Sequence, residues 1–64
     1  MNTEEFSSKL REVQNLMQQE KYDGAIQILE TLKEIEKAGD FDYSLTHKLY
    51  QLLSNSKSLY NQQI

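Results

Sequence analysis

The segment from Tyr22 to Ile35, YDGAIQILETLKEI, restricts the fold more than any other part of the chain. On a helix of about 3.6 residues per turn, its apolar side chains form two adjoining stripes that together cover about half of the circumference. The first stripe contains Tyr22, Ile26 and Leu29, and the second contains Ile28, Leu32 and Ile35. A helix with such a wide apolar surface should pack against two neighbours. The simplest neighbours are one helix before it and one after it; the alternative is that one stripe closes a homodimer.

A narrower amphipathic segment precedes this helix, over residues 3–18. Its apolar residues recur at helical spacing and are Phe6, Leu10, Val13, Leu16 and Met17. Asn2 or Thr3 can cap its start, and Glu5 and Lys9 are spaced for an ion pair. Continuing the stripe would place apolar residues near positions 20, 21 and 24, where the chain has Glu, Lys and Gly. This change of phase predicts a tight turn at residues 18–21 and an antiparallel helical hairpin with a central helix over 22–37.

The third helical segment follows Gly39, which can end the central helix in the left-handed conformation. Asp42 is the expected N-cap, with Asp40 and Ser44 as alternatives, and Phe41 should fold back onto the core. Leucines share one face from Leu45 onward, which predicts a helix over 43–54 or longer. The stretch 54–58, SNSKS, is poor in strong helix formers, so the helix could end there and leave residues 59–64 as a tail.

These segments predict an all-α fold: a three-helix bundle in which a third helix packs across an antiparallel hairpin, in one domain over residues 1–64. A chain of 64 residues buries only about 60% of the surface that it exposes when unfolded, so its core is small. Without cysteine there are no disulfides, and a single histidine does not support a structural zinc site. Self-association or a protein partner is the remaining stabiliser, so we leave an oligomer open.

The charge of the chain is unevenly distributed along the sequence. Residues 1–42 hold all ten acidic residues and five of the seven basic ones, whereas residues 43–64 hold Lys48 and Lys57 and no acid. This asymmetry predicts that the third helix packs beside acidic neighbours. The net charge of −3 argues against binding to a nucleic-acid backbone. The sequence has no apolar run that would span a membrane and no apolar block of a signal peptide, so we expect a cytoplasmic protein.

No arrangement of residues in the chain matches a catalytic or metal-binding motif. Asp40, Asp42 and Ser44 begin like a calcium loop, but its sixth and twelfth positions hold Leu45 and Gln51 instead of Gly and Glu. Di-metal bundles use Glu-x-x-His motifs on facing helices, and this chain has one histidine. We therefore expect no enzyme activity, no cofactor and no metal.

A candidate docking surface lies on the third helix, where Tyr43, His47 and Tyr50 are spaced at i, i+4 and i+7. Lys57 follows on the same side, roughly opposite the leucines. Tyrosine is favoured where one end of the ring is dry and the other wet, as at interfaces. The plainer interpretation is that these tyrosines lean on a neighbouring helix. If the central helix touched only one neighbour, its stripe of Ile28, Leu32 and Ile35 would be the interface instead.

Two families resemble parts of the chain. The spacing of residues 22–32 resembles the second helix of a tetratricopeptide repeat, a family that binds peptides and other proteins. The positions that correspond to the helix-A Leu-Gly pair and to the closing Pro hold Glu12-Val13 and Lys37, and one repeat does not build a stable core. The apolar rhythm of residues 26–52 is similar to N-terminal domains of transcription elongation factors, which bind partner peptides, although the usual Trp is absent. Neither resemblance assigns the chain to a family.

The sequence thus predicts a small helical protein-interaction module, either a regulator or an adaptor. A structural homo-oligomer is the alternative from another class. A weaker alternative is an acidic inhibitor that occupies a nucleic-acid-binding site on its target.

Overall fold

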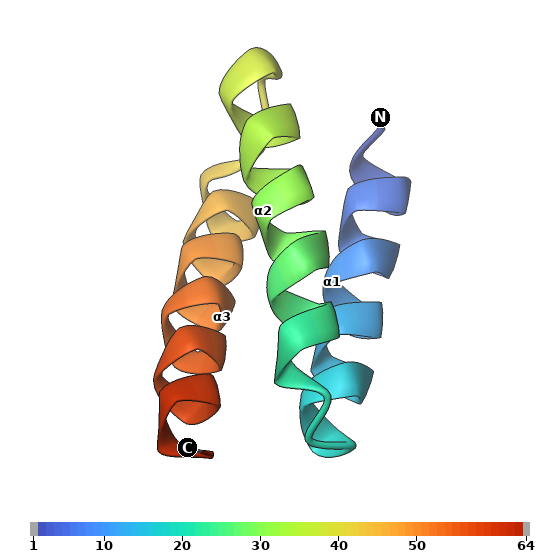
Figure 1. Ribbon diagram of the computed structural model, residues 1–64. Helices are drawn as coiled ribbons and strands as arrows, with labels where there is room; N and C mark the ends of the chain where they lie inside the picture. The colour runs from blue at the N-terminus through green and yellow to red at the C-terminus, as the bar shows by residue number, and fades with distance from the viewer. Residues whose placement is uncertain (1, 64) are drawn as a thin grey trace.

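The computed structural model describes residues 2–63, which form three α-helices joined by two short connections (Figure 1). They are α1 (Thr3–Gln18), α2 (Tyr22–Ala38) and α3 (Tyr43–Gln62). Helix α2 runs antiparallel to both of the others, so α1 and α3 point in the same direction. All three pairs of helices are in contact, in a body with extents of 36 × 17 × 17 Å. The predicted all-α three-helix bundle is therefore confirmed.

The hydrophobic core receives an equal share from each helix. Among residues 2–63 it contains Phe6, Leu10 and Val13 from α1, Ala25, Leu29 and Leu32 from α2, and Leu49, Leu52 and Leu53 from α3. Burying each of the larger side chains contributes about 1.5–3 kcal/mol relative to leaving it exposed. Because the three helices contribute alike, removing any one of them would uncover apolar side chains on both of the others.

The turn between α1 and α2 follows the change of phase seen in the sequence. Lys21 N–H donates to the Leu16 carbonyl at 2.9 Å, and Glu20 N–H donates to the Met17 carbonyl at 3.0 Å. This pair of bonds is the Schellman motif that ends many helices. Its left-handed residue is Glu20, with φ of 61°, at a position where glycine is usual. Tight reversal at this point brings α2 back along α1.

The connection between α2 and α3 differs from the expectation at Gly39. This residue has φ of −113° and ψ of 177°, so the backbone is extended and the prediction of a left-handed cap is wrong. The extended exit carries Phe41 back to the core, where its ring lies 4.5 Å from that of Phe6 between centroids. A Cβ atom on Gly39 would lie 2.5 Å from Cε2 of Phe41. Glycine is therefore required here by the nearby ring and not by a left-handed backbone.

The structure identifies the N-cap residues of α1 and α3, for which the sequence left alternatives open. The Asn2 side chain accepts from Glu5 N–H at 2.8 Å, so Asn2 caps α1. At α3 the Asp42 side chain accepts from Ser44 N–H at 3.4 Å, which makes Asp42 the N-cap.

Helix α3 continues through the serine-rich stretch at residues 54–58 and ends at Gln62. Residues 59–62 are thus helical and not a tail, while residue 64 lies outside the described part of the chain. Leu52 and Leu53 are buried before the stretch where the sequence allowed the helix to end, and Ser56 is buried within that stretch. Packing against the other helices compensates for the weak helix propensity of this stretch.

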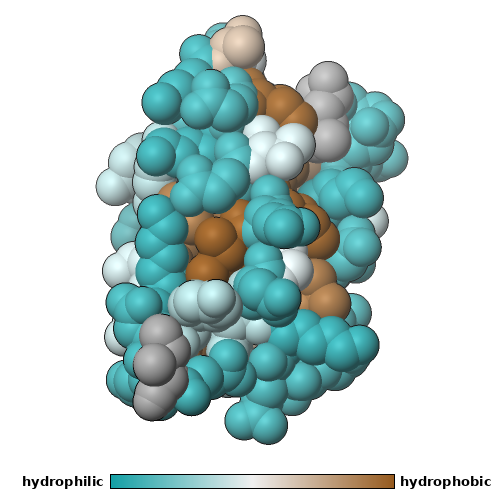
Figure 2. Space-filling model, in the orientation of Figure 1, coloured by the Kyte–Doolittle hydropathy of each residue, from teal (hydrophilic) through white to brown (hydrophobic). Residues whose placement is uncertain are grey.

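Helix α2 has two packing neighbours, as its two apolar stripes predicted. On one side, Ile28 and Leu32 meet Lys9 of α1 around a surface groove. On the other side, Glu30 and Glu36 bond to side chains of α3. Polar residues cover most of the visible face in Figure 2, and apolar surface emerges mainly in the seams between helices.

Candidate interaction surfaces

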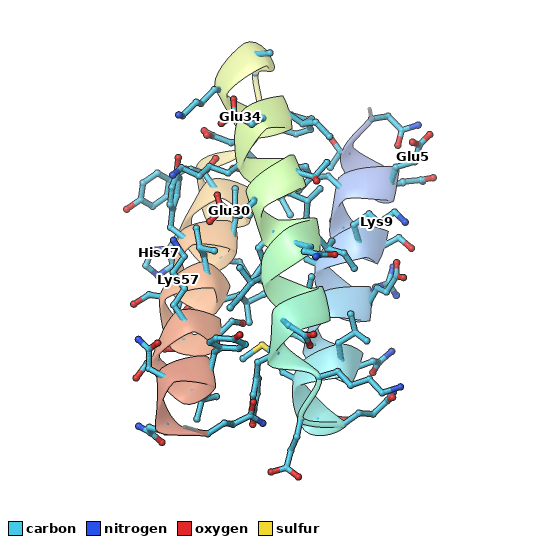
Figure 3. The ribbon with its side chains drawn as sticks, in the orientation of Figure 1. Glu5, Lys9, Glu30, Glu34, His47 and Lys57 are labelled. Atoms are coloured by element: carbon cyan, nitrogen blue, oxygen red, sulfur yellow. The ribbon has the colours of Figure 1, made fainter. Side chains whose placement is uncertain are left out.

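Exposed aromatic side chains gather on α3. Tyr43 is 79% exposed at the first residue of the helix, and its ring stacks on that of His47 with centroids 6.1 Å apart and planes 18° apart. One helical turn separates the two residues, which is why the rings lie over one another. Figure 3 shows His47 on the outer side of α3. The predicted stripe therefore begins with an exposed pair of stacked rings.

Tyr50, the next residue of the stripe, leans toward α2. Its hydroxyl donates to Glu36 Oε2 at 3.3 Å, and Thr46 Oγ1 donates to the other carboxylate oxygen of Glu36 at 3.4 Å. Loss of hydration at the helix seam raises the pKa of Tyr50 above its usual value, and the negative charges of Glu36 and Glu34 raise it further. Tyr50 still has 40% of its surface exposed, so a partner could reach the outer side of the ring.

Lys57, the fourth predicted residue, also bonds to α2. Its Nζ lies 3.1 Å from Glu30 Oε1, and both side chains remain about half exposed, at 53% and 44%. Exposed ion pairs of this kind contribute at most about 1 kcal/mol. Together with the Glu36 contacts, this pair places the acid-free helix beside acidic groups of α2, the packing that the charge asymmetry predicted.

The four predicted residues thus divide into two groups. Tyr43 and His47 contact each other and face outward, whereas Tyr50 and Lys57 each bond to a glutamate of α2. Tyr60 adds a third exposed tyrosine, at 42%. Its exposure follows from its position in the last turn of α3, where the bundle ends. In the sequence, only the position of Tyr60 close to the end of the helical pattern could have predicted its exposure.

A second candidate surface is an open groove of about 290 Å³ between α1 and α2. It is lined by Lys9, Gln27, Ile28, Thr31 and Leu32. Of the alternative interface stripe, Leu32 is buried in the core, and Ile28 and Ile35 pack against it while partly exposed. The stripe is therefore covered only in part within one copy of the chain.

The acidic residues of the surface are interrupted by lysines. Lys9 pairs with Glu12 at 3.3 Å, so the predicted pairing of Lys9 with Glu5 is replaced by a partner on the next turn. Figure 3 shows Glu5 and Lys9 on the outer side of α1. Lys37 lies 3.8 Å from Glu34, and Glu30 is held by Lys57. Within residues 2–63, no three His, Asp or Glu side chains are grouped closely enough to hold a metal ion.

The part of the chain that the structure describes contains no helix with the length and apolar character needed to cross a bilayer. Comparison with known proteins adds no relative from which a role could be carried over. No family model, no curated protein and no solved structure matches this chain.

Proposed function

We propose that this protein is a small protein-interaction module, a regulator or an adaptor of the cytoplasm, that binds through the outer face of α3. One observation carries the proposal. Within residues 2–63, the large hydrophobic side chains that are exposed are Tyr43, Tyr50 and Tyr60, and all three belong to α3. Tyrosine is enriched at protein interfaces and among the residues that dominate binding energy.

The surface charges and the exposed tyrosines favour binding to a protein partner over a role as an acidic mimic of nucleic acid. Mimicry needs a continuous array of carboxylates, and three surface glutamates, Glu12, Glu30 and Glu34, each have a lysine within 4 Å. The exposed tyrosines instead offer rigid rings that bury large areas at a small loss of side-chain entropy.

The proposal is tested by affinity capture on the immobilised chain, with cell extract of its own source and with Tyr43→Ala in parallel. Tyr43 is the most exposed ring, so its removal should leave folding intact and weaken capture of a specific partner by about tenfold or more. Arg11→Ala, on the exposed surface of α1, is the matched control and should retain the partner.

Salt distinguishes the two modes of binding. A contact through tyrosine rings should persist when NaCl is raised to about 0.5 M, whereas charge mimicry should be lost. Equal capture by Tyr43→Ala and by the unaltered chain would contradict the proposal.

A further inference from the structure

We propose that residues 54–63 form a segment that opens as one unit while the rest of the bundle stays folded, and that the unpaired hydroxyl of Ser56 favours this opening. The segment comprises the second part of α3 and its C-cap residue Gln63. The opening itself does not depend on the proposed function. Three observations carry it: where the core ends, the burial of Ser56, and the contacts that hold the segment.

The hydrophobic core ends before this segment begins. Leu53 is the last core residue of α3, and within residues 54–63 the one fully buried side chain is that of Ser56. All other side chains of the segment are exposed except that of Leu59, which is partly buried. Helices in small proteins are stabilised mainly by the packing of their apolar side chains. The segment therefore receives much less stabilisation than residues 43–53, which contribute three core leucines.

The buried side chain of the segment opposes the closed state. Ser56 is fully buried, and its Oγ atom has no hydrogen-bond partner among the described residues. Water hydrates this hydroxyl when the segment opens, so closing removes a hydrogen bond without replacing it. The neighbouring residues do not compensate, because four of the five residues at 54–58 are serine or asparagine, which are weak helix formers.

The polar contacts that join the segment to the other helices are exposed. Lys57 Nζ lies 3.1 Å from Glu30 Oε1, and Gln63 Nε2 donates to the Glu20 carbonyl at 3.3 Å in the α1–α2 turn. Water competes for exposed groups of this kind, so each contact contributes little to stability. Opening therefore breaks only weak polar contacts with α2 and with the turn.

The order of these residues predicts opening of the whole segment instead of gradual fraying from its end. Once Leu59 leaves the bundle, no other apolar side chain holds the preceding turn, and the release of Ser56 restores the hydration of its hydroxyl. The next residues that resist opening are Leu53 and Leu52, which belong to the core. Opening should therefore stop there, as native proteins commonly open in contiguous cooperative units.

Opening would divide the outer face of α3. Tyr43 and His47 stay on the folded part, whereas Lys57 and Tyr60 leave with the segment. A partner that contacts both parts would bind only the closed form, and its apparent affinity would fall with the closed fraction. The segment is thus a conformational control within the candidate surface.

Native-state amide hydrogen exchange, followed by NMR on the free chain, tests the inference. The amides of residues 57–62 should share one opening constant, about a hundredfold or more above that of residues 46–52. Urea should raise this shared constant less steeply than the constant for global unfolding, because the segment exposes less surface. Protection that falls residue by residue toward the chain end, or equal protection in both ranges, would overturn the inference.

A matched pair of serine variants tests the role of the buried hydroxyl. Ser56→Ala should lower the opening constant about fivefold, and Ser58→Ala, at an exposed position of the same segment, by about twofold or less. Both substitutions give the same gain in helix propensity, so their difference reports the hydroxyl. Equal effects of the two variants would contradict its role.

A variant at the other end of the bundle separates local opening from global unfolding. Phe41→Leu weakens packing on Phe6 near the start of α3, far along the helix from the segment. It should raise the global unfolding constant by about tenfold and leave the opening constant of residues 57–62 unchanged. An equal rise in both constants would show that the segment opens only with the whole bundle and would overturn the inference.

Discussion

At the scale of single residues, the buried hydroxyl of Ser56 is the clearest local defect in the core. Ser56 is fully buried on α3, and within the described residues its Oγ atom has no hydrogen-bond partner. A buried polar group that is left unpaired costs about 1–3 kcal/mol, and its removal recovers part of this. Ser56→Ala should therefore raise the free energy of unfolding by about 1 kcal/mol in urea denaturation. Ser54→Ala, an exposed neighbour, should change it by less than about 0.5 kcal/mol, and a destabilised Ser56→Ala would show that the hydroxyl is satisfied.

Tyr50 gives the bundle a dependence on alkaline pH. Its raised pKa means that the folded chain keeps the phenolic proton to higher pH than the unfolded chain does. The corresponding stabilisation is complete below the ordinary pKa of tyrosine and is lost as pH rises through that value toward the folded one. Tyr50→Phe should flatten this alkaline loss, measured as urea midpoints near pH 8 and near pH 11. Parallel losses in the variant and in the unaltered chain would assign the alkaline sensitivity to other groups.

At the scale of elements, the two glycines of the chain should respond oppositely to alanine. A Cβ on Gly24 of α2 would lie 3.8 Å from Leu16 Cδ1, an ordinary contact, so Gly24→Ala should stabilise the helix by about 0.5–1 kcal/mol. A Cβ on Gly39 would press on the Phe41 ring at 2.5 Å and on the Ile35 carbonyl at 3.3 Å. Gly39→Ala should therefore destabilise the fold by about 1–3 kcal/mol. Thermal unfolding of both variants checks the signs, and two shifts in the same direction would contradict this explanation.

The turn between α1 and α2 stores strain at Glu20, whose φ is 61°. A left-handed conformation costs a residue with a Cβ atom about 1–2 kcal/mol. Glycine avoids this cost, but its unfolded chain loses more conformational entropy on folding, which offsets part of the gain. Glu20→Gly should raise the free energy of unfolding by about 1 kcal/mol. Glu20→Ala retains the Cβ and removes the charge, so it should give little or none of this gain. Equal gains from the two variants would attribute the effect to charge instead.

The helical spans and the turn at residues 18–21 could be predicted because they depend on local periodicity. Two features of the fold could not. The extended backbone of Gly39 depends on the packing of the Phe41 ring against Phe6, which lies 35 positions away in the sequence. The continuation of α3 depends on the burial of Leu52, Leu53 and Ser56 against other helices, and propensity alone does not show it. For the same reason, spacing identified the pairing of Tyr43 with His47, but not the glutamates of α2 that hold Tyr50 and Lys57.

At the scale of the whole molecule, short connections and helices adjacent in sequence favour rapid folding. Helical bundles of this kind fold in microseconds to milliseconds, and the chain contains no proline that could add a slow isomerisation step. Temperature-jump relaxation followed by tyrosine fluorescence should thus show a single exponential faster than about 10 ms, with no phase of seconds. A slow phase whose rate depends on protein concentration would indicate an assembly step instead.

Three helices that alternate in direction place the beginning of α1 and the end of α3 at opposite poles of the bundle (Figure 1). Sequences fused before α1 and after α3 would emerge at opposite ends of a body whose longest extent is 36 Å, which makes the bundle a rigid spacer for two attached reporters. The same geometry works against circular permutation, because a linker between the two termini would have to run along the long axis of the bundle. The efficiency of resonance energy transfer between reporters at the two ends would therefore change when the bundle unfolds, so it could be used to follow unfolding directly.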